Sequence, residues 1–355
     1  MRILAWPDAS GQNDNPYVAL LHAELAAKGH KIERLSRRGL LTRPDVIHIH
    51  WPEQLVRTQS AASLVSDAVK LLLLLALARR RGAVLVWTAH NLRPHEQRRR
   101  RLMDAYLTVF VALVDVVIGM TDRSRTLLVA RYPLLKRKPF IVVPHGHYRD
   151  VYTALGDRDK TACRRRVGLD PQRRTLLTLG QIRPYKNAPA LVRAFVAGAS
   201  HDAQLAVVGG VSSGALRTEL EAARNCDERV HLRLSAVDPE ELATWHAAAD
   251  VVVLAYDTAS SLNSGAALLA LSLDRPVIMP DGPSAVALRA QVGSDWVTPV
   301  SGPASAFVAA ALATPAPPSA RPDLDHLGWQ TVADQTAAAY ALARERRGHR
   351  SRRRR

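Results

Sequence analysis

The first residues with chemical potential lie in the segment His48-Ile49-His50-Trp51-Pro52-Glu53, which ends a short apolar run. Alternate side chains of an extended strand share a face, so His48 and His50 point the same way. A histidine pair at this spacing could bind a metal ion, but no further ligand set is evident, and we expect structural histidines with no metal. Glu53 beside Trp51 places a carboxylate next to a flat apolar surface, which is what a sugar acceptor needs.

A second polar segment, Ala89-His90-Asn91-Leu92-Arg93-Pro94-His95-Glu96, follows the next apolar run. His90 comes directly after the strand, and Arg93 and Glu96 are close enough in sequence to reach the same region. An imidazole at such a position can be a buried structural group or an acid–base group, because its ordinary pKa lies near neutrality. The crowding of polar residues favours a functional role.

Two cations lie three residues apart in Gly180-Gln181-Ile182-Arg183-Pro184-Tyr185-Lys186-Asn187, after an apolar run that ends at Leu179. Arg183 and Lys186 can pair with phosphate oxygens, the arginine in a bidentate manner. They could alternatively be ordinary surface charges. Gly180 allows the backbone to approach a ligand closely, which favours a binding site.

A further anion site is predicted where Ser260-Ser261-Leu262-Asn263-Ser264-Gly265 leads into an apolar helix. The free N–H groups and the positive dipole end of a helix N-terminus attract anions. One serine alone would be explained as an N-cap. The succession of hydroxyl groups, an asparagine and a glycine exceeds what capping requires.

The elements that must position these residues alternate between strand and helix. We expect strands at residues 3–6, 46–50, 84–88, 114–119 and 140–143, and again at 176–179, 204–208, 230–234, 251–254 and 276–279. Strands separated by helix-length segments imply an α/β fold with parallel, doubly wound sheets. Such sheets bind ligands outside the carboxyl ends of their strands, where all four polar segments lie.

The length of 355 residues suits two domains of about 150 to 180 residues each. We place a Rossmann-like domain at residues 1–156 and a second one at 157–320, with both domains facing one interdomain cleft. A C-terminal helix at 323–343 is expected to pack back across the domains. Residues 344–355 are expected to be a disordered basic tail.

Composition excludes several classes of protein. A chain with 47% hydrophobic and 23% charged residues is typical of a soluble globular protein. Two cysteines exclude a disulfide framework and suit a reducing cytoplasm. The net charge is +17, of which the eight arginines and one glutamate of residues 344–355 supply 8 − 1 = +7. The remaining basic clusters are short and lack the interleaved aromatic residues that stack on bases, so no nucleic-acid partner is expected.

These segments, in this order and spacing, resemble the GT-B glycosyltransferases, in particular the bacterial lipid-linked β-mannosyltransferases of exopolysaccharide assembly. The resemblance covers residues 1 to about 281 and is most specific at 48–53, 88–91, 182–187 and 263–277. It implies that Arg183 and Lys186 hold the diphosphate of a nucleotide sugar. It also implies further donor contacts at Gly180, Val237, Ser261, Asn263, Ser264 and Gly265, and acceptor contacts at Asn13, Asn15, Trp51 and Arg93.

One departure from the family pattern bears on stereochemistry. Many retaining GT-B enzymes carry two glutamates separated by seven residues, and this sequence has Ser261 and Leu269 at those positions. We therefore expect an inverting transfer, which needs a protein base to take the acceptor proton. Glu53 and His90 are the candidate catalytic bases. Since no Asp-x-Asp motif stands at a strand end, we expect neither a metal nor another cofactor.

The sequence thus predicts a hexosyltransferase of the mannose or glucose type, using a nucleoside diphosphate sugar such as GDP-mannose and a saccharide or lipid-linked glycan acceptor. The alternative is a catalytically silent nucleotide-sugar or glycan-binding protein on the same fold. We expect a cytoplasmic protein without a spanning segment. The apolar stripe of residues 61–81 and the nearby arginines at 98–101 could attach it to an anionic inner membrane face. Ordinary core packing of that helix is the competing interpretation.

Overall fold

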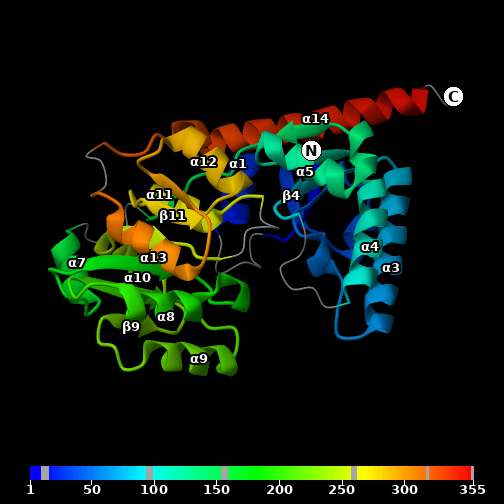
Figure 1. Ribbon diagram of the computed structural model, residues 1–355. Helices are drawn as coiled ribbons and strands as arrows, with labels where there is room; N and C mark the ends of the chain where they lie inside the picture. The colour runs from blue at the N-terminus through cyan, green and yellow to red at the C-terminus, as the bar shows by residue number, and fades with distance from the viewer. Residues whose placement is uncertain (9–15, 93–98, 153–158, 257–261, 317–319, 353–355) are drawn as a thin grey trace. The chain divides into compact units, whose positions relative to one another are not determined.

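The computed structural model describes residues 1–8, 16–92, 99–152, 159–256, 262–316 and 320–352, which form two compact units (Figure 1). The first unit comprises Met1–Gly146, Ser260–Asn263 and His326–Arg355, and the second comprises His147–Ala259 and Ser264–Asp325. The chain therefore changes unit after Gly146, earlier than the boundary predicted at 156/157. The C-terminal helix belongs to the first unit.

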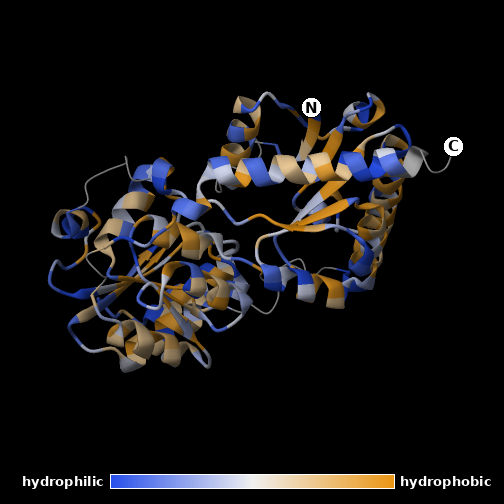
Figure 2. Cartoon of the chain, turned by 90° about the horizontal axis from the view of Figure 1, so that it is seen from above, coloured by the Kyte–Doolittle hydropathy of each residue, from blue (hydrophilic) through white to orange (hydrophobic). Residues whose placement is uncertain are grey.

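The first unit is built on a six-stranded parallel sheet with the strand order β2-β1-β3-β4-β5-β6. Strands β3 and β4 are buried along their whole length, as is typical of a parallel sheet covered on both faces. Figure 2 shows the strands of this sheet largely in the orange of hydrophobic residues. The strands are β1 (Arg2–Trp6), β2 (Lys31–Arg34), β3 (Val46–Ile49), β4 (Val84–Ala89), β5 (Val116–Gly119) and β6 (Phe140–Val142).

Helices cover this sheet and supply much of its core. The long helix α3 packs on the sheet through Leu64, Ala68 and Leu75, and α4 lies beside it (Figure 1). The helices of the unit are α1 (Tyr17–Ala27), α2 (Arg37–Leu41), α3 (Ala61–Arg80), α4 (Arg100–Leu113), α5 (Asp122–Arg131) and α14 (Trp329–Arg352), with short 3-10 turns η2 (Pro52–Leu55) and η3 (Pro133–Arg137). The turn η5 (Asp325–Leu327) leads into α14.

Helix α14 corrects the expectation for the C-terminus. It packs against α1 and over β4 and β5, and its helical conformation continues to Arg352. The prediction of a disordered tail from residue 344 is therefore wrong for residues 344–352, and residues 353–355 lie outside the described part. The arginine-rich sequence contains no capping signal that would indicate a helix. Arginine itself nevertheless favours the helical conformation.

Helix α3 is long and apolar enough, by length and composition alone, to cross a membrane. Its 20 residues coincide with the apolar stripe that the sequence indicated at 61–81. In the fold it contributes one face to the core of the first unit, while Val65, Val69 and Leu73 on the other face remain exposed. The predicted apolar stripe therefore divides into an inner and an outer face.

The second unit repeats the architecture, with a six-stranded parallel sheet of order β12-β11-β10-β7-β8-β9. Its strands are β7 (Arg174–Leu179), β8 (Ala203–Val208), β9 (Val230–Arg233), β10 (Val251–Val253), β11 (Val277–Pro280) and β12 (Val297–Val300). Its helices are α6 (Arg149–Tyr152), α7 (Lys160–Arg166), α8 (Ala188–Gly198), α9 (Gly214–Arg224), α10 (Pro239–Ala248), α11 (Gly265–Ser272), α12 (Pro283–Val292) and α13 (Ala304–Ala313), with the 3-10 turn η4 (Pro184–Lys186).

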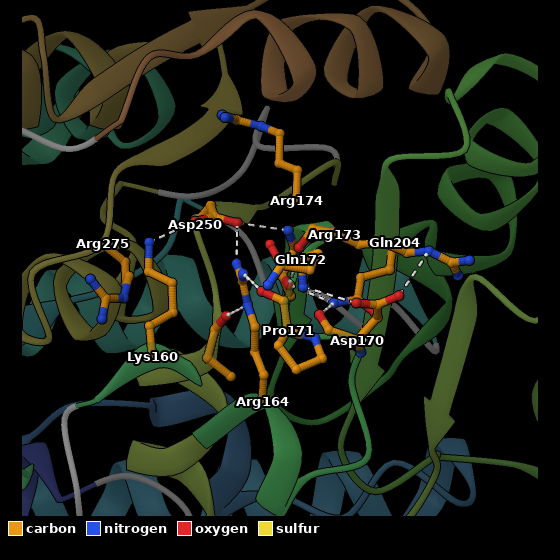
Figure 3. Close-up of polar contacts among 12 residues, drawn as sticks. Lys160, Arg164, Asp170, Pro171, Gln172, Arg173, Arg174, Gln204, Asp250 and Arg275 are labelled. Atoms are coloured by element: carbon orange, nitrogen blue, oxygen red, sulfur yellow. Dashed lines mark hydrogen bonds and ion pairs between the residues drawn. The ribbon is translucent and has the colours of Figure 1, made fainter. Parts of the chain in front are cut away.

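A partly buried ion network fastens the amino ends of β7 and β10 in this unit (Figure 3). The Asp250 carboxylate accepts hydrogen bonds from Lys160 Nζ at 2.7 Å, from an Arg164 guanidinium nitrogen at 2.5 Å and from the Thr175 N–H at 2.7 Å. Arg164 Nε also donates to the Ala248 carbonyl at 3.0 Å. The network therefore ties helix α7 to two strands at the sheet edge opposite the strand carboxyl ends.

Candidate active site

The strand ends of β3 and β4 emerge side by side in the first unit. Their parallel register pairs Ile49 with Trp87, so the segment from His50 to Glu53 and the segment from His90 leave the sheet at the same edge. The sequence predicted this neighbourhood from two separate motifs.

His50 and His90 form a buried pair at this edge, with His50 Nδ1 hydrogen-bonded to His90 Nε2 at 2.9 Å. The Trp51 indole stacks on the His90 ring, with centroids 4.2 Å apart and planes at 20°. Tyr17 of α1 contacts both imidazoles edge-on. Burial, together with neighbouring histidines, places the pKa of His50 and of His90 well below the ordinary value. Both rings are therefore neutral at pH 7.

His48 is a structural residue, as expected. Its Nε2 hydrogen-bonds Thr88 Oγ1 at 2.7 Å, and its Nδ1 hydrogen-bonds the Tyr340 hydroxyl of α14 at 2.7 Å. Burial, and the nearby His22, lower the pKa of His48 to about 3. Within the described ranges, no group of three or more His, Cys, Asp or Glu side chains is arranged to hold a metal ion.

Glu53 lies in the 3-10 turn η2, directly after the stacked Trp51. This turn is anchored by Tyr106 of α4, whose hydroxyl donates to the Pro52 carbonyl at 2.9 Å. Glu53 and His90 line the same small cavity of about 20 Å³. Burial raises the pKa of Glu53 to about 7, and the carboxylate is thus balanced between its two protonation states near neutral pH.

The second cluster lies at the strand ends of the second unit. Strands β10, β7, β8 and β9 are successive neighbours, so the loops that follow them share one edge. Gly180 after β7 has φ +111°, and Gly209 after β8 has φ +141°. A side chain on Gly209 would place its Cβ 2.2 Å from the Gly180 carbonyl oxygen, so the two loops touch backbone to backbone.

Lys186 folds back over the Gly180 loop. A Cβ on Gly180 would lie 3.2 Å from Lys186 Nζ, which shows how close the ammonium group is to the strand end. Burial, together with the charge of Arg183, lowers the pKa of Lys186 to about 8. Two cations brought together and partly desolvated in this way form a site for an anion.

The N-terminus of α11 belongs to the same unit and is linked to this loop by aromatic contacts. The Ser264 hydroxyl caps the helix by accepting from the Ala267 N–H at 3.2 Å and also hydrogen-bonds the Tyr256 hydroxyl at 2.8 Å. The Tyr256 ring contacts the Tyr185 ring edge-on at 5.9 Å, next to Lys186 in η4. The N–H of Gly265 precedes the first bond of the helical ladder, which runs from Leu268 N to the Ser264 carbonyl.

The structure does not bring all predicted site residues together. Val237 lies in the loop after β9, where the neighbouring Asp238 caps α10. Asn263 belongs to the first unit, with its Nδ2 2.5 Å from Met120 Sδ, whereas Ser264 and Gly265 belong to the second. The predicted residues Asn13, Asn15, Arg93 and Ser261 lie outside the described residues.

Comparison with known proteins identifies the family. Residues 173–314 match the family model described as glycosyl transferases group 1. Over 324 residues the chain is 32% identical to a GDP-mannose:glycolipid 4-beta-D-mannosyltransferase of Xanthomonas campestris pv. campestris, covering 90% of this chain and 86% of that protein. The chain belongs to the group 1 glycosyltransferases. This membership favours a transferase over the silent binding protein that the sequence left as an alternative.

Solved structures show that this glycosyltransferase has the GT-B fold. HepE from Anabaena, in complex with UDP-glucose, is similar with a TM-score of 0.64 at 14% identity, covering 98% of both chains. Sucrose-phosphate synthase from Thermosynechococcus elongatus is similar with a TM-score of 0.62 at 17% identity, covering 99% of this chain and 98% of its own. The predicted α/β class with two doubly wound sheets is confirmed.

Several residues of this glycosyltransferase's candidate site were missed by sequence reasoning. Tyr17 of α1 contacts His90, and Tyr340 of α14 contacts His48. No local sequence pattern predicts such contacts. Gly209 could have been found, because Gly209-Gly210 follows directly after an apolar run, as Gly180 does. Tyr256 carries only the weaker signal of a polar aromatic residue at a strand end.

Proposed function

We propose that this glycosyltransferase transfers a mannosyl residue from GDP-mannose to a hydroxyl of a lipid-linked glycan, with inversion and without a metal ion. The observation that carries the reaction type is the half-buried Lys186 beside Arg183, within the unit that also holds the N-terminus of α11. The relationship to the Xanthomonas protein supports the choice of donor and acceptor, since that protein is named for GDP-mannose and a glycolipid.

In this proposal the second unit binds the donor. Arg183, Lys186 and the N–H groups at the start of α11 stabilise the negative charge that grows on the diphosphate as the anomeric C–O bond breaks. Fixed cations and helix N–H groups take the part that a divalent ion plays elsewhere. Transfer should accordingly continue in the presence of EDTA.

The first unit supplies the base. Glu53 accepts the proton of the acceptor hydroxyl while that oxygen attacks the anomeric carbon from the face opposite the diphosphate. A base with a pKa near the working pH is best suited to this step, and the pKa of Glu53 is about 7. His90 is less suited, because burial makes its protonated form unfavourable. We assign His90, through its stack with Trp51, to positioning the acceptor.

The stereochemistry of donor and product provides independent support for an inverting transfer. The mannose of GDP-mannose is α-linked, so a β-mannoside can arise in one displacement only with inversion. Ser261 and Leu269, where retaining relatives carry glutamates, agree with that course. The lipid-linked acceptor also suggests that the enzyme works at the cytoplasmic face of a membrane, where nucleotide sugars are made.

The first test is a donor screen with purified protein, a panel of labelled GDP- and UDP-sugars and a lipid-linked oligosaccharide acceptor, with and without EDTA. We expect transfer from GDP-mannose in both conditions, and NMR of the product should show a β-mannosyl linkage. An α-linked product would contradict the inverting course, and loss of transfer with EDTA would contradict metal independence.

The second test replaces Glu53 by Gln and, separately, His90 by Asn. Loss of the base should lower kcat about 100-fold or more while the Kd for GDP-mannose stays unchanged. We expect this result for Glu53→Gln and a rise mainly in the acceptor KM for His90→Asn. A parallel loss of donor affinity in Glu53→Gln would make Glu53 a donor contact instead of the base.

A further inference from the structure

A basic groove opens at the edge of the first sheet opposite the strand carboxyl ends. It has a volume of about 930 Å³ and is bordered by the end of α3, the segments that enter β5 and β6, and the last turns of α14. Its charged lining consists of Arg79, Arg80, Asp115, Arg137, Lys138, Arg344, Arg346 and Arg347. Seven cations against one carboxylate give it a formal charge of 7 − 1 = +6.

Part of this charge builds the groove. Arg79 binds the Asp115 carboxylate through two hydrogen bonds of 3.0 and 2.5 Å. Arg347 of α14 donates to the Arg79 carbonyl and lies 3.7 Å from Asp115, so the last helix is fastened to the end of α3. Lys138 donates to the Ala112 carbonyl at the end of α4. These contacts hold Arg79, Arg347 and Lys138 in a fixed arrangement.

Other cations of the groove face solvent. Arg80, Arg137 and Arg346 are exposed, and among the described residues no carboxylate lies within ion-pair distance of them. Arginines held close together without counter-charges bind phosphate groups strongly. The groove therefore fits a ligand that presents several phosphates.

An exposed apolar strip leads directly into the groove. On the outer face of α3, Val65, Val69 and Leu73 are 46%, 50% and 65% exposed, and Ala76 lines the groove itself. By helical periodicity Arg80 lies on the same face, one turn beyond Ala76. The neighbouring helix α4 (Figure 1) also carries an exposed valine, Val109. Figure 2 shows the last turns of α14 in the blue of hydrophilic residues.

We propose that the groove and the outer face of α3 form a docking site for an anionic phospholipid membrane. The groove holds headgroup phosphates, and the side chains of Val69 and Leu73 enter the boundary between headgroups and acyl chains. A nucleic acid fits less well, because no aromatic residue capable of stacking on a base is among those that line the groove. The site extends the proposed function, which requires a lipid-linked acceptor.

This assignment changes which basic residues are expected to bind the membrane. The sequence suggested a surface made by α3 and the arginines at 98–101. In the structure Arg99 donates to the Gln59 carbonyl, just before α3 begins, so this arginine lies at the other end of the helix. The C-terminal residues 344–347, expected to be disordered, provide part of the groove instead.

The test is co-sedimentation of the full chain with vesicles of phosphatidylcholine mixed with phosphatidylglycerol, and with vesicles of phosphatidylcholine alone. The triple variant R80E/R137E/R346E should lose affinity for the anionic vesicles by about 100-fold. The matched control R123E/R125E/R224E changes the same charge at exposed arginines outside the groove and should lose less than about tenfold. L73S should weaken binding by about tenfold, whereas V286S, at an exposed valine in the second unit, should not.

Equal losses in the two charge variants would overturn the groove as the site. Equal binding of neutral and anionic vesicles would overturn headgroup recognition, and tighter binding of duplex DNA than of anionic vesicles would overturn the lipid assignment in favour of a nucleic acid. Inorganic tripolyphosphate that binds the groove while vesicles do not would mark a site for a soluble anion.

In the triple variant, transfer to a detergent-solubilised acceptor should remain at the wild-type rate. If neither the wild type nor the triple variant transfers mannose, while the wild type still binds anionic vesicles, the proposed function alone is contradicted.

Discussion

At the scale of single residues, the proposed donor site depends on Lys186, which is only half-buried. Its ammonium group lies close to Gly180, and burial with the neighbouring Arg183 lowers its pKa to about 8. A cation that has given up part of its hydration interacts strongly with an incoming anion. The binding of a diphosphate would also stabilise the charged form of the lysine.

Replacing Lys186 or Arg183 by Ala should therefore reduce kcat/KM by about 100-fold or more, because each variant loses a charge-assisted contact that strengthens as the diphosphate leaves. Steady-state kinetics with labelled GDP-mannose checks this prediction. Arg193→Ala is the matched control. Arg193 of α8 forms an exposed ion pair with Glu219 of α9, and its replacement should change kcat/KM little. Two site variants with activity within a few-fold of the wild type would exclude the phosphate role.

The pH dependence of kcat/KM should be bell-shaped with a narrow maximum. Glu53 acts as a base only when deprotonated, so activity rises as pH passes about 7, and Lys186 binds the diphosphate only when protonated, so activity falls as pH passes about 8. Lys186→Arg keeps its charge to far higher pH and should remove the falling limb. A rate that stays flat from about one pH unit below the pKa of Glu53 to about one pH unit above that of Lys186 would contradict both assignments.

At the scale of elements, the two edges of each parallel sheet carry different contacts. The carboxyl ends of β3 and β4 lead into the candidate residues of the first unit, and those of β7 and β10 into the candidate residues of the second, whereas the amino ends of β7 and β10 carry the Asp250 network. Substitutions at the two edges should accordingly affect different measurements.

Asp250→Asn should lower the free energy of unfolding by about 3 kcal/mol, because the buried Arg164 loses its charged partner. Glu240→Gln, at the exposed ion pair with Arg166, is the control and should cost less than about 1 kcal/mol. Urea unfolding at pH 7 measures both.

The stability that Asp250 provides should also depend on pH. Burial alone would raise the pKa of Asp250, but the hydrogen bonds from Lys160 and the Thr175 N–H leave it below the ordinary value of 3.8. A carboxyl group whose pKa is lowered by folding stabilises the protein above its unfolded pKa, and this contribution is lost as pH falls through the folded value. The difference between wild type and Asp250→Asn should therefore shrink in acid.

At the scale of the whole molecule, the end of the chain completes the unit with which the chain begins. The hydrogen bond between Tyr340 and His48 joins residues 292 positions apart, and Trp329 occupies the space beside Gly146 in which a side chain would collide. Helix α14 thus contributes to the core of the first unit and, through Arg347, to the basic groove.

Tyr340→Ala should destabilise the first unit by about 4 kcal/mol, because it removes a fully buried aromatic side chain. Tyr340→Phe, which deletes only the hydroxyl, should cost about 1 kcal/mol. Gln330→Ala, at an exposed position on the same helix, serves as the control. Thermal unfolding should show these losses, and a Tyr340→Ala protein as stable as the Gln330→Ala protein would mean that α14 adds nothing to the unit.

The sequence by itself determined the α/β class, the strands of both sheets except β2 and β12, and the two strand-end motifs around His90 and Lys186. These features are local: apolar runs form strands, and polar residues directly after parallel strands must share an edge. The missed strands are edge strands, and β2, with the sequence Lys-Ile-Glu-Arg, has no apolar run to reveal it.

Tertiary structure alone decided the rest. It raised the pKa of Glu53 and lowered that of Lys186, because desolvation depends on what other segments cover these groups. It also made His48 structural through Tyr340 and turned scattered arginines from α3, η3 and α14 into one groove. Residues far apart in sequence meet only through the packing of whole elements, and a local pattern of residue types carries no record of such contacts.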